Sequence, residues 1–341
     1  MKDIHENRKH FLVSELLKIL SLKKSYSVKI FQGFDELMKI PNPVLTIGTF
    51  DGVHLGHQKI INQLNEEAKK VGGESVLFTF YPHPRMVLFP ESHGLKLIQT
   101  QVEKLEKLER IGLQNVIVHP FTKEFSRLTA TEFVRDYLVN KLKVKIIVIG
   151  YDHQFGKNRE GTLKLLQELA PIYDFTVIEI GAEDINDVNV SSTKIRKAVQ
   201  NGSIERANEF LGDFFKLGGE VIHGKEVGRS IGFPTANIAV DNDIKLLPKN
   251  GVYAVRVKLE NSAEFFGILN IGTRPTVDAS NKVSIEVYIL DFDQEIYNQY
   301  ITLKLLKFVR DEVKYENLST LKDQIAKDEK LVRSWIDEFG W

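Results

Sequence analysis

The chain has 341 residues, and its 46 lysines and arginines balance 46 aspartates and glutamates, so the formal net charge is zero. Because a basic excess drives non-specific binding to nucleic acids, this balance argues against a nucleic-acid partner and indicates that anions are bound by local groups. There is no cysteine, which excludes disulfides, thiol catalysis and thiolate metal sites and fits a cytoplasmic protein in a reducing compartment. The length predicts two domains, each with its own core.

We expect the first 26 residues to be a separate N-terminal extension. Its stretch FLVSELLKIL has the apolar spacing of an amphipathic helix, and Glu15 and Lys18 make it a poor signal-peptide core. We expect this helix to dock on the body of the protein, with binding to a membrane or a partner as the alternative. No apolar run approaches the roughly 18 residues needed to span a bilayer, so a membrane-spanning protein is not expected.

Between residues 44 and 180, short β-branched runs recur at regular intervals, and helical patterns fill the gaps between them. This alternation is typical of an α/β domain with a doubly wound parallel sheet and helices on both of its faces. In such sheets, ligands bind at the carboxyl ends of the strands. The expected strands are VLTIGTF, SVLFTFY, NVIVHPF, KIIVIG and FTVIEI.

The segment TIGTFDGVHLGHQKII is a candidate phosphate site. A strand ending at Phe50, a turn at Gly52 and a helix starting near Leu55 would direct free backbone N–H groups at an anion. His54 and His57 can face the same side of the first helical turn, where imidazoles donating to phosphate oxygens would stabilise charge during phosphoryl or nucleotidyl transfer. A pair of core histidines and a metal-binding pair are the alternatives, but neither accounts for the glycines and the strand-to-helix position.

A second candidate phosphate site is the segment VSSTKIRKAV, residues 190–199. Ser192 is the expected N-cap of a helix, which would place Thr193 and Arg196 on one face. An arginine fork beside a hydroxyl group suits the outer oxygens of a triphosphate. Any capped helix carries such residues, so an ordinary surface helix is the alternative.

After residue 212 the pattern changes to alternating apolar and polar residues with turn signals between the runs. This alternation predicts an antiparallel sheet, in the form of a small β-barrel. We place the junction near residues 211–217, which gives domains at 27–212 and 213–341. The expected strands are GVYAVRVKL, EFFGILNIG, KVSIEVYILDF and YITLKLLKFVR, followed by the terminal helix LSTLKDQIAKDEKLVRSWIDEF.

The segment GGEVIHGKEVGRSIGFPTANI has the spacing of a Walker A loop but lacks its chemistry. Glu226 stands where a Ser or Thr must bind magnesium, and GRSIGFPT cannot propagate the required helix. The glycines instead predict a flap whose backbone N–H groups wrap phosphates. In an extended PTAN segment, Thr235 and Asn237 point the same way and offer the hard oxygen ligands that Mg²⁺ prefers. A turn leading into a strand is the alternative.

Together these motifs resemble a known family. TFDGVHLGH resembles the HxGH signature of nucleotidyltransferases and SSTKIR their second phosphate motif, and FTFYPHPRMV and IGYDHQFGKNREG narrow the match to bacterial bifunctional riboflavin kinase/FAD synthetases. GFPTANI, GVYAVRV, GILNIGTRPTV, SIEVYILDF and FVRDEVKYENLSTLKDQIAKD resemble the flavokinase half. The resemblance implies that the barrel phosphorylates riboflavin to FMN, that the α/β domain adenylylates FMN to FAD, and that ATP and Mg²⁺ serve both steps.

For the α/β domain, the resemblance implies that His54, His57 and Arg196 hold the phosphates of ATP during catalysis. Asp51 would orient the turn or face the magnesium. Further residues implied to contact ATP or its phosphates are Gly48, Phe50, Gly56, Ser192 and Thr193. The implied flavin-side residues are Pro82, His83, Pro84, Arg85, Asp152, Phe155 and Arg159, although PHPR alone is equally typical of a rigid turn. His153 and Gln154 depart from the family pattern.

For the barrel, the resemblance implies that Glu286 is the general base for the ribityl 5′-hydroxyl of riboflavin and that Thr235 and Asn237 hold Mg·ATP. Without the resemblance, the alternating pattern makes Glu286 a solvent-facing strand residue. Arg310 would approach the flavin or the phosphates, or else pair at the surface with a neighbouring carboxylate. The flap residues implied to contact phosphates are Gly224, Lys225, Gly228, Gly232 and Pro234.

Two departures from the family concern substrate fit: Tyr288 stands where His is common, and Asn298 where Gly is common. Two rival functions stay open. In one, only one half of the chain is active; in the other, the chain is a flavin-responsive regulator of riboflavin genes. The neutral charge and the absence of a helix-turn-helix signal argue against direct DNA contact.

Overall fold

The computed structural model describes residues 27–35, 37–90, 94–151, 153–181, 190–224, 227–240, 244–261, 263–274 and 282–341. The expected N-terminal helix and two expected site residues, Asp152 and Lys225, lie outside this part of the chain. Close approaches between Cα atoms divide the chain into two compact units. The first comprises residues 1–95 and 99–191, and the second comprises residues 96–98 and 192–341.

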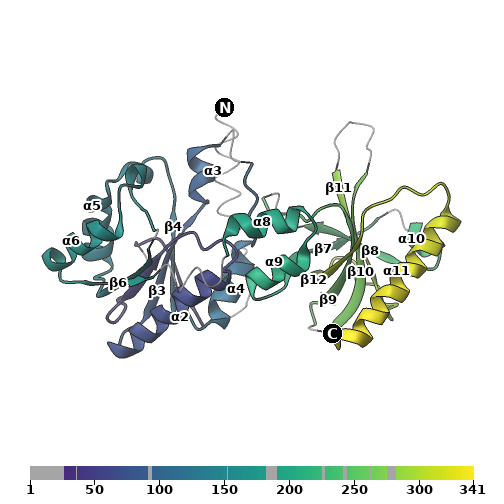
Figure 1. Ribbon diagram of the computed structural model, residues 1–341, viewed down its shortest axis with the longest axis horizontal. Coiled ribbons are helices and arrows are strands. Elements are labelled where there is room, and N and C mark those ends of the chain that lie inside the picture. The colour runs from purple at the N-terminus through teal and green to yellow at the C-terminus, as the bar shows by residue number, and fades with distance from the viewer. Residues whose placement is uncertain are drawn as a thin grey trace. The chain divides into compact units, whose positions relative to one another are not determined.

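The first unit contains a six-stranded sheet in the order β1-β4-β3-β2-β5-β6 (Figure 1). Every neighbouring pair is parallel. The strands are β1 Lys29–Gln32, β2 Val44–Ile47, β3 Ser75–Tyr81, β4 Asn115–Pro120, β5 Ile146–Gly150 and β6 Thr176–Ile180. The parallel sheet and its five expected strands are confirmed. β1 is an additional edge strand whose four residues are too few to show a pattern.

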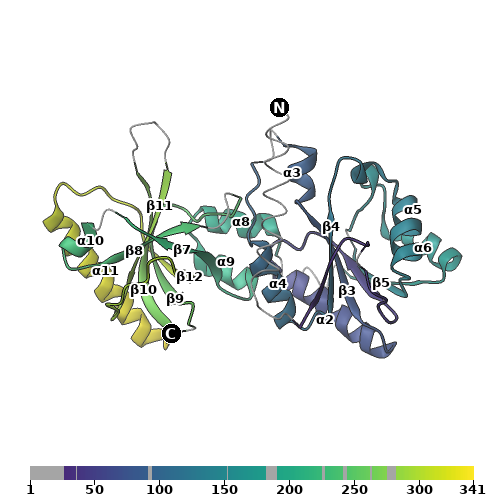
Figure 2. The same ribbon diagram turned by 180° about the vertical axis from the view of Figure 1, so that it is seen from behind.

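Helices cover both faces of this sheet, as expected (Figures 1 and 2). Successive strand residues point to opposite faces, so Val148 packs with Leu64 and Leu105 on the face covered by α2 and α4, and Ile147 packs with Leu138 and Leu166 on the face covered by η2 and α6. The helices are α2 Leu55–Lys70, α3 Pro84–Leu88, α4 Gln101–Arg110, α5 Ala130–Phe133 and α6 Leu163–Tyr173, with the short helices η1 Phe125–Arg127 and η3 Lys157–Arg159 and the π-helix η2 Val134–Lys141.

The second unit is a closed antiparallel barrel in the order β10-β11-β8-β7-β12-β9, which confirms the expected barrel. The strands are β7 Phe215–Ile222, β8 Thr235–Val240, β9 Gly251–Lys258, β10 Glu264–Arg274, β11 Lys282–Ile289 and β12 Tyr300–Arg310. The flap contains α10 Val227–Ser230, a single helical turn where no helix was expected. It is followed by Gly232, whose φ of 90° ends the helical conformation, and by Pro234.

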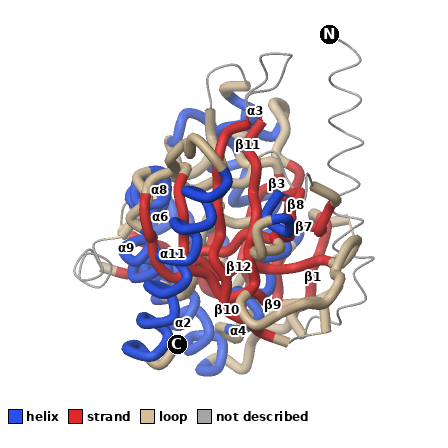
Figure 3. The backbone as a smooth tube through the Cα atoms, turned by 90° about the vertical axis from the view of Figure 1, so that its right-hand side faces the viewer, coloured by secondary structure: helices blue, strands red, loops and turns tan. Residues whose placement is uncertain are grey.

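The terminal helix α11 Leu318–Phe339 has the bounds expected from the sequence. Asn317 caps its N-terminus by accepting a hydrogen bond from the Thr320 N–H at 3.0 Å, and Gly340 ends it in the left-handed conformation with φ of 60°. Val332 and Trp335 of α11 pack on apolar side chains of the barrel. Figure 3 shows α11 in blue beside the red barrel strands.

Two helices precede the barrel in the chain, α8 Ser192–Gln200 and α9 Ile204–Leu211. The side chain of Asn208 in α9 donates to the Leu305 carbonyl of β12 at 2.9 Å and accepts from the Phe215 N–H at 2.7 Å. These contacts attach α9 to the barrel, and both helices belong to the second compact unit. The domain boundary expected after residue 212, which assigns α8 and α9 to the first domain, stays a prediction.

Arg310 anchors α11 to the barrel. Its guanidinium group donates to both carboxylate oxygens of Asp328 at 2.7 to 3.0 Å, and Gln324 donates to the same carboxylate at 2.9 Å. The Asp328 side chain is 4% exposed. Arg310 therefore forms a buried ion pair within the second unit, in place of the surface pair that the sequence left open.

We expect Asp328→Ala to lower the free energy of unfolding of the second unit by about 3 kcal/mol, because it leaves a largely buried guanidinium group without its counter-ion. Urea unfolding followed by tryptophan fluorescence measures this change, since Trp335 and Trp341 both belong to this unit. Asp323→Ala, at an exposed position of the same helix, is the control and should change stability by less than about 0.5 kcal/mol. Equal stabilities of the two variants would contradict the prediction.

Candidate active sites

Two histidines stack at the start of α2, directly after the carboxyl end of β2. His54 is the N-cap, and its Nδ1 accepts a hydrogen bond from the His57 N–H at 3.4 Å. The centroids of the two imidazole rings lie 3.6 Å apart with 16° between the ring planes, and the Phe50 ring stacks on His57 at 4.4 Å. The expectation that both imidazoles face the same side of the first helical turn is therefore confirmed.

The turn that carries these histidines has an unusual backbone. Phe50, Gly52 and Val53 have φ values of 48°, 91° and 38°. A positive φ is an outlier for a β-branched residue and persists only where surrounding contacts over-determine it. Val53 is fully buried, its N–H donates to the Phe50 carbonyl at 3.2 Å, and its carbonyl accepts from the Gln58 side chain at 2.9 Å. The surrounding contacts thus hold a conformation that the local sequence disfavours.

Both imidazoles are neutral at physiological pH. Burial and, to a lesser extent, Lys107 lower the pKa of His54 to about 4. Burial, the neighbouring His54 and the lysines Lys104 and Lys107 hold the pKa of His57 well below its usual 6.5. Nδ1 of His57 is buried and has no hydrogen-bond partner among the described residues. If Nε2 of His57 carries the proton, the buried Nδ1 is an unpaired acceptor rather than an unpaired N–H donor. Nε2 is therefore the atom suited to donate to a ligand.

We expect the first unit to lose stability as the pH falls from 7 to 4.5. The pKa of His54 is about 4 in the folded state and near 6.5 in the unfolded state, so the unfolded state binds the proton first and stability falls with pH across this window. The loss from His54 alone is on the order of 2 to 3 kcal/mol. Urea unfolding followed by far-UV circular dichroism at both pH values measures it, and an equal pH dependence in His54→Gln would contradict this assignment.

Other residues of the opening motif support the histidines. A Cβ on Gly56 would lie 3.3 Å from Nδ1 of His54 and 3.5 Å from Val190, so this glycine makes room for the imidazole. A Cβ on Gly48 would lie 2.8 Å from the Phe50 ring. Asp51 is buried and its carboxylate accepts from the Gln99 N–H at 3.4 Å, which is consistent with a role in orienting the turn.

The second phosphate motif lies in α8. The helix begins at Ser192, so Ser192 is its first residue rather than the expected N-cap. Thr193 is exposed, and Nε of Arg196 donates to the Lys96 carbonyl at 3.0 Å. These residues belong to the second unit, whereas His54 and His57 belong to the first. The role of α8 in holding ATP phosphates stays a prediction.

The PHPR segment follows β3 and starts a short helix, α3, rather than forming only a turn. His83 is the N-cap, and its Nδ1 accepts from the Arg85 N–H at 3.1 Å. Pro84 is the first helical residue, where a missing N–H costs nothing. Arg85 is exposed, and Pro82 and His83 are half-buried. The imidazole of His83 thus has a structural role in this helix.

Two further flavin-side candidates differ in their surroundings. Phe155 is 8% exposed and belongs to the core, whereas Arg159 is exposed with a φ of 62°.

Three half-buried aromatic rings near the carboxyl ends of β3 and β4 were not predicted from the sequence. They are those of Phe80, Phe121 and Phe125, and their centroids lie 5.4 to 5.8 Å apart. Aromatic residues just where adjacent parallel strands end are the signal that could have identified them.

In the second unit, Thr235, Asn237 and Glu286 come together on adjacent strands. Asn237 of β8 lies opposite Glu286 of β11, and Thr235 is two residues before Asn237, so all three side chains share one face of the sheet. Oγ1 of Thr235 donates to Oε2 of Glu286 at 3.5 Å. Asn237 is 9% exposed and Glu286 is half-buried. Glu286 is therefore not simply a solvent-facing strand residue.

Two neighbours of Glu286 were missed from the sequence. Oγ of Ser284 donates to Oε1 of Glu286 at 2.8 Å, and Asn270 of β10 lies opposite Glu286 across the sheet. The two-residue alternation of KVSIEVY places Ser284 on the same face as Glu286 and is the signal that could have found it. The carboxylate is thus oriented by hydroxyl groups on both of its oxygens, from Thr235 and Ser284.

The glycine flap passes close to this cluster. A Cβ on Gly224 would lie 2.1 Å from the Asn237 side chain, and one on Gly228 would lie 2.3 Å from the Phe233 carbonyl oxygen and 3.3 Å from Oγ1 of Thr235. Only glycine allows this approach. Among the described residues, no group of three or more His, Asp or Glu side chains could hold a metal. The hard oxygens of Thr235 and Asn237 still fit Mg²⁺, provided that a bound ligand supplies further oxygens.

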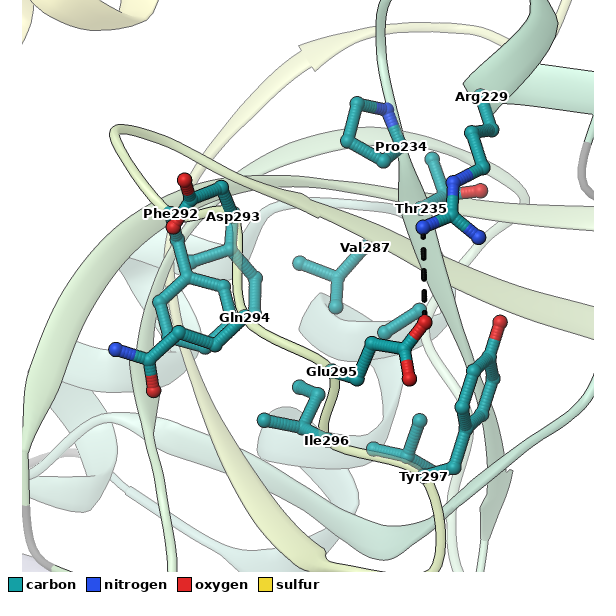
Figure 4. A pocket seen from close by; sticks show the side chains of 13 residues that line it. Arg229, Pro234, Thr235, Val287, Phe292, Asp293, Gln294, Glu295, Ile296 and Tyr297 are labelled. Atoms are coloured by element: carbon teal, nitrogen blue, oxygen red, sulfur yellow. Dashed lines mark ion pairs between the residues drawn. The ribbon is translucent and has the colours of Figure 1, made fainter.

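A cavity of about 250 Å³ adjoins the cluster through Thr235, whereas Asn237 and Glu286 do not line it (Figure 4). It lies between the flap and the segment 292–297, and most of its lining is apolar. Arg229 of the flap faces Glu295 across its mouth, with 3.6 Å between the guanidinium nitrogen and the carboxylate oxygen. Both side chains are more than half exposed, so this ion pair adds little stability.

Asn298 and Tyr288, the two departures from the family pattern, both fit their local surroundings. Asn298 has a φ of 61°, a left-handed conformation that Asn tolerates almost as well as Gly. Its N–H donates to the Val221 carbonyl at 2.9 Å. The Tyr288 ring meets the ring of Phe233 edge-on at 5.3 Å, and burial raises the pKa of its hydroxyl group.

A parallel sheet with paired imidazoles at a strand-to-helix turn, joined to a barrel with a glycine flap over Thr, Asn and Glu side chains, defines a two-part nucleotide-using enzyme. Family models agree with this class: FAD synthetase matches residues 38–194 and riboflavin kinase matches residues 211–336. The chain belongs to the bifunctional riboflavin kinase/FMN adenylyltransferase family.

Similar proteins span nearly the whole chain. A bifunctional riboflavin kinase/FMN adenylyltransferase of Buchnera aphidicola is 37% identical over 313 residues, covering 91% of this chain and 99% of its own. The enzyme of the same name from Listeria monocytogenes is 40% identical over 297 residues, covering 86% and 93%. A crystal structure described as a macrolide-efflux protein from Streptococcus pneumoniae has a TM-score of 0.80 and 30% identity and covers 91% and 99%. In the part of the chain that the structure describes, no helix is long and apolar enough to cross a membrane.

Proposed function

We propose that this chain phosphorylates riboflavin to FMN in the barrel and adenylylates FMN to FAD in the α/β unit, with ATP as the donor in both steps. The observation that carries the proposal is the Thr235, Asn237 and Glu286 cluster beneath the glycine flap, on a barrel joined to a second unit with stacked neutral imidazoles. The two candidate sites lie on different folds and carry different side chains, which suits two different transfers.

In the kinase step, Glu286 accepts the proton of the ribityl 5′-hydroxyl while that oxygen attacks the γ-phosphorus of ATP, and ADP leaves. Ser284 and Thr235 donate to the two carboxylate oxygens and fix their direction. The cavity beside Thr235 supports a place for the adenosine part of ATP, because its lining is mostly apolar, which suits a base, and includes Arg229 and Pro234 of the flap. The flap glycines would then lie over the phosphates.

Thr235 and Asn237 would hold Mg²⁺ together with ATP oxygens. When bound, the ion supplies positive charge that offsets the charge developing on the transferred phosphoryl group. The side chains themselves contribute neutral oxygens at a fixed spacing on one strand. Their neutrality leaves Glu286 as the one carboxylate of the cluster, which suits a base that must not be neutralised by permanent coordination.

In the adenylyl step, a phosphate oxygen of FMN attacks the α-phosphorus of ATP, and pyrophosphate leaves. His54 and His57 are neutral before ATP binds, so their binding of the triphosphate depends on hydrogen-bond donation rather than on a full positive charge. Nε2 of His57 is the proposed donor to a phosphate oxygen, and its donation strengthens as negative charge grows in the transition state. The half-buried rings of Phe80, Phe121 and Phe125 offer an apolar surface of the kind that a flavin ring would contact.

The proposal is tested by incubating the purified chain with riboflavin, ATP and Mg²⁺ and separating the flavins by chromatography. We expect FMN to appear first and FAD to follow. FMN alone would indicate a chain with only the kinase active, and unchanged riboflavin together with measurable flavin binding would indicate a binding or regulatory protein.

A further inference from the structure

A buried lysine lies beneath the turn that carries the two histidines, and neither of the two proposed transfer steps uses it. Lys104 belongs to α4 and is 5% exposed. Its ammonium group donates to the Thr49 carbonyl at 2.8 Å and to the Thr79 hydroxyl at 2.8 Å. A lysine is almost never buried without a specific partner, and here both acceptors are neutral.

These hydrogen bonds connect three elements at one point. Thr49 opens the turn after β2, Thr79 lies near the end of β3, and Lys104 lies in α4. The hydroxyl of Thr79, which is fully buried, also donates to the Thr49 carbonyl at 3.3 Å. The ammonium and hydroxyl groups therefore fix the carbonyl that immediately precedes Phe50, the first residue of the turn with a positive φ.

The same helix supplies a second cation to the turn. Lys107 is 3% exposed, and its ammonium group approaches the Gly52 carbonyl at 3.5 Å. Lys104 and Lys107 are three residues apart and so lie on one face of α4. The titratable groups acting on His57 are His54, Lys104 and Lys107, and the one acting on Lys104 is the carboxylate of Asp51.

We propose that Lys104 is a positioning residue for the adenylyl-transfer step, which holds the strained turn and thereby the stacked imidazoles of His54 and His57 in place for ATP. This inference depends on the proposed role of the two histidines. The positive φ values of the two non-glycine residues of the turn, Phe50 and Val53, need contacts that over-determine the backbone, and the Lys104 ammonium group supplies such a contact at the carbonyl that precedes Phe50. The same charge also opposes protonation of His57, which keeps the imidazole in its donating neutral form.

Lys104→Met tests the proposal, because it keeps the apolar length of the side chain and removes the ammonium group. We expect kcat for FAD formation from FMN to fall at least about tenfold with a smaller change in KM for ATP, since a small displacement of catalytic groups can cost this much. FMN formation from riboflavin should stay within twofold of wild type, which serves as an internal control in the same chain. Lys69→Met, at an exposed position of α2, is the matched surface control.

If Lys104 only stabilised the fold, its replacement would leave the pH profile of FAD formation unchanged. Loss of the Lys104 charge should shift the acid limb of the FAD-formation profile to higher pH, because protonation of His57 is then less strongly opposed. Lys104→Arg, which keeps the charge, should restore the wild-type limb. A Lys104→Met enzyme with wild-type kcat for FAD formation, or with an unshifted acid limb, would overturn the proposal.

Thr79→Val provides a second test if Lys104→Met does not fold. It removes one acceptor of the ammonium group and one donor to the Thr49 carbonyl at nearly constant volume, and should lower kcat for FAD formation several-fold; a wild-type kcat would overturn the proposal. His57→Ala distinguishes a failure of the proposed histidine site from a failure of the positioning role of Lys104. If His57→Ala leaves FAD formation intact, the assignment of the histidine site is wrong. If His57→Ala abolishes FAD formation, whereas Lys104→Met and Thr79→Val form FAD at the wild-type rate, only the positioning role of Lys104 is wrong.

Discussion

Glu286→Gln should lower the rate of FMN formation from riboflavin by about 10² to 10⁴-fold, the usual contribution of a general base. The amide keeps the size of the carboxylate and can still contact Thr235 and Ser284, but it cannot accept the proton of the attacking hydroxyl group. Conversion of added FMN to FAD should be unchanged, because that reaction uses the other unit. Initial rates with riboflavin and with FMN as separate substrates measure both activities.

Glu264→Gln is the matched control for this variant. Glu264 is a carboxylate of the same barrel, on β10, and it accepts from the Lys304 ammonium group at 2.7 Å. We expect this substitution to leave both activities within about twofold, because surface ion pairs contribute little. A folded Glu286→Gln protein that forms FMN at the wild-type rate would exclude Glu286 as the base.

His57→Ala should have the opposite effect, lowering FAD formation from FMN by about 10² to 10³-fold, the range seen when a donor to a developing oxyanion is removed. FMN formation from riboflavin should continue at the wild-type rate, so FMN accumulates. His57→Asn is a useful companion variant, because its amide can still donate one hydrogen bond and should retain more activity than alanine. Loss of both activities in a folded His57→Ala protein would contradict the division of labour between the units.

The parts of the first site that follow from local pattern were predictable. The alternation of apolar runs and helices predicted the parallel sheet, and the spacing of His54 and His57 predicted that the two imidazoles lie on the same side of the first helical turn. Lys104 could not be found in this way, because it meets Thr49 from 55 positions away in the sequence. In EKLEKLERIG the lysines resemble the solvent-facing side of a helix, and only the fold shows that Lys104 and Lys107 turn inward.

In the second unit, the sequence identified residues of the candidate site but did not predict the contacts that these residues make. PTAN in an extended strand fixed the common direction of Thr235 and Asn237, but the pairing of β8 with β11 that brings Glu286 beside them is a long-range contact. Arg310 was expected near the flavin or phosphate, with a surface pair as the alternative; its ion pair with Asp328 depends on the docking of α11. Such contacts between distant segments have no local signal.

The central claim is that one chain carries out two different transfers from ATP, and isotopic labelling tests it most directly. Riboflavin is incubated with ATP labelled either at the γ-phosphate or at the α-phosphate, and the label in FMN and FAD is counted. Two separate sites predict that the γ-label enters FMN and persists in FAD, that the α-label enters FAD and never FMN, and that His57→Ala retains the first incorporation and loses the second. An α-label in FMN, or FAD formed from riboflavin without any γ-label, would contradict the account.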